Sequence, residues 1–147
     1  MFEKIVVGVD GEPGRAGRVV AAAEVVARAA NAEVLVAHVQ ELERSAAIAA
    51  TPRAGALHPM VADDRAPQTE AFVDLTVERF RRAGLGARGV VQPGEGSTAK
   101  ELLKIAEAFG ATLIVVGDRG QRVADLLLGG VAQKVLRDAD CSVLLVR

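Results

Sequence analysis

Two glycine-marked segments near the C-terminus carry the residues best suited to bind a ligand. Residues 117–120 read Gly-Asp-Arg-Gly after an apolar run, and Gly129-Gly130 precedes a helical pattern through residues 131–136. Glycine lets backbone N–H groups approach a ligand closely, and a helix N-terminus favours an anion. We expect these amides to hold phosphate oxygens, with Arg119 adding positive charge. The alternatives are a strand-to-helix connection in which glycine only relieves strain, and a hinge at Gly129-Gly130.

Asp10 is the carboxylate placed to complete such a site. It directly follows the β-branched run Lys4 to Val9. At the carboxyl end of a parallel strand it can accept hydrogen bonds from a ribose hydroxyl or a base amine. The alternative is an aspartate that caps the following turn or helix.

Other chemistries have little support. No Ser-His-Asp or Cys-His order, nucleophile elbow or His-x-x-x-His pair occurs, so we expect no catalytic residue. Two histidines and one cysteine make a poor metal set. His38 reads as a core histidine and Cys141 as a small buried hydrophobe. The glycines of 94–98 and 11–14 read as turns, because neither segment spells a phosphate-loop or dinucleotide motif.

Strands and helices alternate along the chain. The expected strands are 4–9, 33–39, 87–92, 113–116 and 143–146. The first expected helix covers about 14–31 and the last covers 131–136. A second helix begins at Pro67 and is ended by Gly84 and Gly86, and its expected buried residues are Phe72, Val73, Leu75, Val77 and Phe80. A third runs from Ser97 to Gly110, with a capping box formed by Thr98 and Glu101. Segment 40–66 is the least regular, with helix expected only near 41–50. The alternation predicts an open, doubly wound α/β sheet in one domain, 1–147.

Composition narrows the possible partners. The chain has 147 residues, a net charge of -1, no Trp or Tyr and four Phe, so neither a basic surface nor aromatic stacking for nucleic acid is expected. No apolar run is long enough to cross a bilayer, and the N-terminus lacks a basic, apolar leader. One cysteine gives no disulfide framework. We expect a cytoplasmic protein that binds neither nucleic acid nor membrane.

Four segments together resemble the universal stress protein family. They are I-V-V-G-V-D-G at 5–11, L-V-A-H-V at 35–39, L-I-V-V-G-D-R-G at 113–120, and L-L-L-G-G-V-A-Q-K-V-L-R-D-A-D-C-S-V-L-L-V-R at 126–147. The resemblance implies an adenine nucleotide alpha hydrolase-like fold. This fold is an open five-stranded parallel sheet with helices on both faces and strand order 3-2-1-4-5. It also implies a homodimer through the last strand, Cys141 to Arg147, whose bare apolar edge would pair with a second copy. The alternative is an edge shielded by its own twist and Arg147.

The nucleotide-binding members of the family carry Gly, two residues, Gly, nine residues, then Gly followed by Ser or Thr. Gly117 and Gly120 match the first half. The second half can be aligned in two ways. Nine residues after Gly120 lead to Gly130, with Val131 in the Ser/Thr position, whereas eight residues lead to Gly129, with Gly130 in the Ser/Thr position. We prefer the second alignment, because the surrounding Leu-Leu-Leu-Gly sequence also matches the family. Either way the hydroxyl is missing, which removes one neutral hydrogen bond worth roughly 0.5–1.5 kcal/mol.

Carried over by position, the resemblance implies one set of residues around the adenosine and another facing the ribose and phosphates. The first set is Val9, Asp10 and Val39, and the second is Gly117, Arg119, Gly120, Gly129, Gly130 and Val131. The expected function is an adenine-nucleotide (ATP, ADP or AMP) binding stress-response module with at most slow hydrolysis. A dimeric interaction module with a degenerate phosphate loop is the alternative. An enzyme, such as a phosphotransferase or nucleotidyl-transfer relative, is a third reading.

Overall fold

The computed structural model describes residues 1–11, 13–41, 66–94, 96–118 and 130–147. Within them the chain alternates strictly between strand and helix. The elements are β1 (Lys4–Gly8), α1 (Pro13–Ala30), β2 (Glu33–Glu41), α2 (Ala66–Arg82), β3 (Ala87–Gly94), α3 (Thr98–Phe109), β4 (Leu113–Gly117), α4 (Gly130–Asp138) and β5 (Ser142–Val146). The helix expected near 41–50 lies almost wholly outside the described residues.

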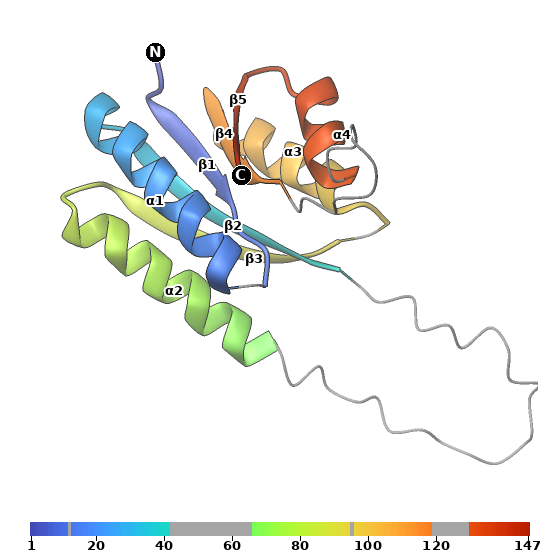
Figure 1. Cartoon of the computed structure of the whole chain (residues 1–147), viewed down its shortest axis with the longest axis horizontal. Helices are drawn as coiled ribbons and strands as arrows, with labels where there is room; N and C mark the ends of the chain where they lie inside the picture. The colour runs from blue at the N-terminus through green and yellow to red at the C-terminus, as the bar shows by residue number, and fades with distance from the viewer. Residues whose placement is uncertain (12, 42–65, 95, 119–129) are drawn as a thin grey trace, which may run out of the picture.

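The strands form one five-stranded parallel sheet in the order β3-β2-β1-β4-β5. Helices α1 and α2 cover one face, and α3 and α4 cover the other (Figure 1). The predicted fold class and strand order are therefore confirmed. The chain leaves β1 toward β2 on one side and returns as β4 on the other. The carboxyl ends of β1 and β4 thus form the topological switch point of the sheet, the place where open α/β sheets bind ligands.

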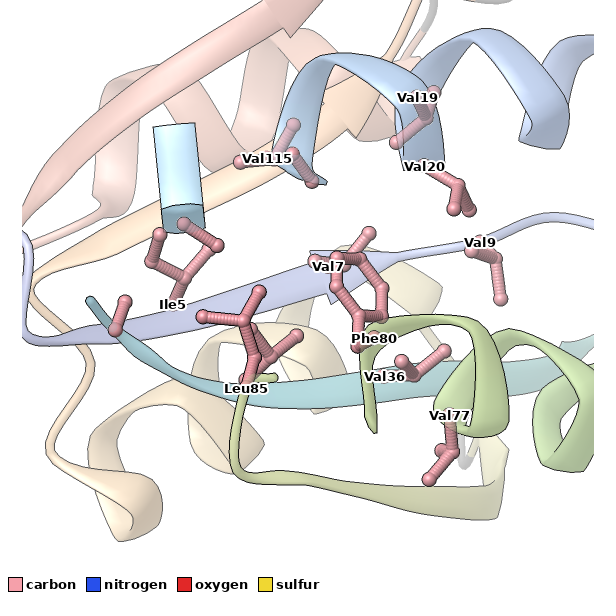
Figure 2. Packing of buried hydrophobic residues seen from close by; sticks show 14 of the residues in the cluster. Ile5, Val7, Val9, Val19, Val20, Val36, Val77, Phe80, Leu85 and Val115 are labelled. Atoms are coloured by element: carbon pink, nitrogen blue, oxygen red, sulfur yellow. The ribbon is translucent and has the colours of Figure 1, made fainter. Parts of the chain in front are cut away.

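The central strand β1 is apolar on both sides because helices cover both faces of the sheet. Ile5, Val6 and Val7 have no exposed surface. Ile5 and Val7 belong to the core under α1 and α2, and Val6 to the core under α3 and α4. Figure 2 shows the first of these cores, with Val19 and Val20 directed from α1 toward the sheet. Strand β1 is therefore a rigid base for Asp10, which follows it.

Helix α1 buries a stripe of small residues, as its spacing predicted. Ala16, Ala23 and Ala27 are almost fully buried. Small side chains let the helix axis lie close to the sheet. This close approach brings the first turn of α1 next to the ends of β1 and β4.

The start of α3 differs from the prediction. Ser97 is the N-cap, with extended backbone, and its hydroxyl accepts a hydrogen bond from the Lys100 N–H at 3.3 Å. Thr98 is already helical, so the expected Thr98–Glu101 capping box is wrong. Glu101 is instead a buried carboxylate that accepts a hydrogen bond from Lys104 Nζ at 2.9 Å. Gly110 ends the helix in the left-handed conformation, as predicted.

Two burial predictions are also wrong. Leu75, expected on the buried side of α2, is 72% exposed, and Thr76 is buried in its place. The Thr76 hydroxyl donates to the Phe72 carbonyl at 2.8 Å, which satisfies the buried polar group. Cys141 is half-buried and not fully buried.

Candidate functional site

The sequence-predicted site residues gather at the carboxyl edge of the sheet. Asp10 follows β1, Gly117 ends β4, and Gly130 begins α4. Because β1 and β4 are parallel neighbours, Asp10 and Gly117 leave the sheet at adjacent positions of this edge. Arg119, Gly120 and Gly129 lie outside the described residues.

Val9 and Val39 do not face a common space. Val9 packs in the core under α1 and α2, whereas Val39 packs in the core under α3 and α4. Both are nearly buried, at 5% and 6% exposed. The two valines expected around one adenosine therefore lie on opposite faces of the sheet.

His38 fixes the chain just before Asp10. Its Nδ1 lies 2.8 Å from the Val9 carbonyl oxygen. A carbonyl oxygen can only accept, so Nδ1 carries the proton and donates. The Val9 N–H in turn donates to the Ala37 carbonyl at 2.9 Å. His38 was expected in the core but is only half-buried, and its hydrogen bond holds the backbone just before Asp10.

Asp10 forms an ion pair that was not predicted from the sequence. Nε of Arg15, in the first turn of α1, lies 3.0 Å from Oδ2 of Asp10. The two side chains are only 25% and 23% exposed, and Nε itself is buried. The sequence signal was an arginine five residues after the aspartate. The turn expected over 11–14 is wrong at Pro13 and Gly14, which already belong to α1, and this early helix start places Arg15 in the first turn, where it meets Asp10.

Gly117 lies directly against α1. A Cβ atom at this position would be 3.0 Å from Cγ2 of Val19. After Gly117 the Asp118 N–H donates to the Val146 carbonyl at 2.9 Å, and Asp118 Oδ2 lies 3.9 Å from Arg147 Nε. The end of β4 therefore lies between two ion pairs, one toward β1 and one toward β5.

Helix α4 begins at Gly130. This glycine is exposed, and an added Cβ would meet no atom of the described residues within 4 Å. Val131 is partly buried against the α3 side of the core. The expected helix start at this position is confirmed. The first N–H groups of such a helix have no partner within the helix and can bind an anion.

A groove of about 750 Å³ lies elsewhere, between β3 and α3. None of the ligand-binding residues predicted from the sequence lines this groove. Its lining residues are Leu35, Arg88, Gly89, Val90, Gln92, Pro93, Glu101, Lys104, Ile105, Ala108 and Phe109.

Comparison with known proteins identifies the family. The universal stress protein family model matches residues 1–147. The chain belongs to the universal stress protein family. A universal stress protein of Thermus aquaticus, named for the 3' region of QAH/OAS sulfhydrylase, is 32% identical over 155 residues that cover 100% of both chains.

Solved structures of universal stress proteins share the fold. One in complex with cAMP is 26% identical, has a TM-score of 0.71, and covers 99% of this chain and 97% of its own. One from Archaeoglobus fulgidus in complex with dAMP is 22% identical, also has a TM-score of 0.71, and covers 99% and 98%. Some structural neighbours of this universal stress protein therefore bind adenine nucleotides.

Two negative findings apply to the part of this universal stress protein that the structure describes. No group of three or more His, Cys, Asp or Glu side chains there is arranged to hold a metal ion. No helix in the described ranges combines the length and hydropathy needed to cross a membrane.

Proposed function

We propose that this universal stress protein binds an adenine nucleotide in the crevice between the carboxyl ends of β1 and β4. The observation that carries the proposal is that Asp10 and Gly117 lie at adjacent positions where β1 and β4 end, at the switch point of the sheet. The cAMP and dAMP complexes of structural neighbours support the choice of ligand class. The protein then acts as a stress-response binding module and not as an enzyme.

The proposed roles follow the chemistry of each group. Asp10 accepts hydrogen bonds from the ribose or the base amine, and the backbone around Gly117 and the first turn of α4 face the phosphates. ATP is the proposed ligand, with ADP and AMP as shorter ligands of the same site. Each phosphate adds charge at the helix N-terminus.

Calorimetry on the purified protein tests this proposal. Nucleotide released by denaturation is first identified by mass spectrometry, and ATP, ADP and AMP are then titrated against wild type and Asp10→Ala. Asp140→Ala is the matched control, because Asp140 is an exposed aspartate on the turn before β5. We expect Asp10→Ala alone to weaken binding. A wild-type protein that releases no nucleotide and gives no heat with any of the three would reject the proposal.

A second candidate is a dimeric interaction module that binds no nucleotide. The specific observation in its favour is the absence of Ser or Thr at both 130 and 131, the positions at the start of α4. Binding of a protein partner by a variant that has lost the Asp10 carboxylate, at wild-type affinity, would favour this candidate.

The proposed assembly is a homodimer through β5, located in the cytoplasm. Strand β5 is the outermost strand at one edge of the sheet, with Val143 to Val146 only partly buried. The Val146 carbonyl accepts a hydrogen bond from the Asp118 N–H, so Val146 directs its backbone groups toward β4. Backbone groups alternate in direction along a strand, so the N–H and C=O groups of Val143 and Leu145 point away from β4. Outward N–H and C=O groups can pair with a second β5. A single cysteine suits a reducing compartment.

A further inference from the structure

We infer that Arg15 is a phosphate-sensing residue of the proposed nucleotide site. Without ligand it neutralises Asp10. With nucleotide its guanidinium pairs with a phosphate and releases Asp10 to the ribose or base. This inference rests on the proposed function and adds a residue and a specificity to it.

The position of α1 carries the argument. Val19 contacts the position of a Gly117 Cβ, so α1 crosses the end of β4 at that turn. Arg15 lies four residues earlier, on the same face of the helix and one turn nearer its N-terminus. Helix α1 therefore carries Arg15 past the end of the sheet, on the ligand side. There its Nε is 3.0 Å from Asp10.

Burial makes this pair responsive to a ligand. Both side chains are about three-quarters buried, so water screens their charges less than it screens a surface pair. A phosphate that enters beside Asp10 meets a carboxylate whose repulsion Arg15 offsets from 3.0 Å. A guanidinium forms two parallel hydrogen bonds to phosphate, which a lysine cannot do. Exchange of the carboxylate for a phosphate thus keeps Arg15 paired throughout.

The inferred Arg15–phosphate contact would also offset the departure from the family motif. The family hydroxyl supplies one neutral hydrogen bond to phosphate, and this chain has Gly130 and Val131 in its place. A charge-assisted hydrogen bond from Arg15 is roughly twice as strong as a neutral one. Arg15 can therefore compensate for the missing hydroxyl from the opposite wall of the crevice.

A purely structural ion pair is the competing explanation. Such a pair would fix α1 to β1 and would affect the unliganded fold, without distinguishing a ligand with phosphate from one without. The two roles separate when ligands that differ only in phosphate are compared.

The test titrates ATP, AMP and adenosine against wild type, Arg15→Gln and Arg15→Lys. Arg18→Gln is the matched control, since Arg18 is an exposed arginine one turn further along α1. We expect Arg15→Gln to weaken ATP binding about tenfold or more. Adenosine binding should be unchanged or stronger, because Asp10 is no longer neutralised. Arg15→Lys should recover part of the loss, and Arg18→Gln should match wild type. Thermal melts of each unliganded variant confirm that it is folded.

The outcomes separate the two ideas. ATP binding by wild type with no loss in Arg15→Gln and Arg15→Lys would overturn the role of Arg15 and leave the proposed function intact. Equal losses for ATP and adenosine would identify a structural pair and also overturn it. No binding of any of the three ligands by wild type would overturn the proposed function and, with it, this inference.

Discussion

Gly117 and Val19 meet so closely at the end of β4 that a methyl group on Gly117 would lie 3.0 Å from Cγ2 of Val19. The glycine that begins the family's phosphate motif is thus also a packing residue between β4 and α1. A substitution there changes the fold and the proposed site together. Binding data on Gly117 variants therefore need a stability measurement beside them.

We expect Gly117→Ala to destabilise the fold by about 1–3 kcal/mol, because Val19 is β-branched on a helix and cannot easily rotate away. Gly17→Ala is the matched control. Gly17 lies within the same α1 helix, and an added Cβ would meet no atom within 4 Å in the part of the chain that the structure describes. It should stabilise the fold by about 0.5–1 kcal/mol, since alanine loses less conformational entropy in a helix. Urea unfolding measures both, and equal stability of the two variants would contradict the packing argument.

Gly130→Ser should strengthen ATP binding by several-fold to about tenfold. The added hydroxyl restores one hydrogen bond worth roughly 0.5–1.5 kcal/mol. Among the described residues no atom lies within 4 Å of an added Cβ at Gly130, so the side chain does not clash with them. Calorimetric titration of the variant, with Gly130→Ala as control for the added Cβ, isolates the hydroxyl. Equal affinities of the serine and alanine variants would show that this hydroxyl does not reach a phosphate.

Val143→Pro should shift the protein from dimer to monomer. The Val143 N–H is directed away from β4, so proline removes an outward donor and leaves the β4–β5 ladder in place. Val143→Ala loses similar packing but keeps the N–H, and it should remain dimeric. Light scattering after size-exclusion chromatography gives the mass. A proline variant that stays folded and dimeric would exclude pairing through this edge.

The Cys141 thiol should react slowly with iodoacetamide. Burial raises the pKa of this thiol, and the neighbouring Asp140 carboxylate raises it further. The thiolate is the reactive form, so the pH of half-maximal rate should be higher in the folded protein than in urea. By linkage, the protonated Cys141 thiol contributes to the free energy of unfolding. This contribution is fully present below the unfolded pKa, about 8.5, and is lost as pH rises through the pKa of the folded state. Cys141→Ser, which removes the only cysteine, is the blank, and a faster rate in the folded state would contradict the prediction.

Much of the fold could be predicted because continuous apolar runs and glycine stops mark each strand. The run Ile5 to Val7 is typical of a parallel strand covered on both faces, and it is fully buried. Details at helix boundaries were harder. Ser97 and Thr98 are both good caps in sequence, and only the backbone conformation distinguishes them. Leu75 and Thr76 are neighbours on α2, and a rotation of one residue decides which is buried.

The candidate site could be predicted only in part. Asp10 and Gly117 were found because each directly follows an apolar run in the sequence. Arg15 was missed because its contact with Asp10 depends on how the chain turns into α1, and five residues of separation allow many geometries. The opposite facing of Val9 and Val39 follows from the pleat of two neighbouring strands and their register, which the sequence leaves open.

The two sides of the proposed site differ in their resistance to local unfolding, because β1 is the fully buried central strand whereas β5, beside β4, is an edge strand. Backbone amides of Val6 and Val7 can exchange with heavy water only when most of the sheet comes apart, whereas those of the outermost β5 are reachable through fraying of one edge. Asp10 thus sits on the wall that keeps its shape longest. In the proposed site, adjustment to nucleotides of different length then falls to the β4–β5 side.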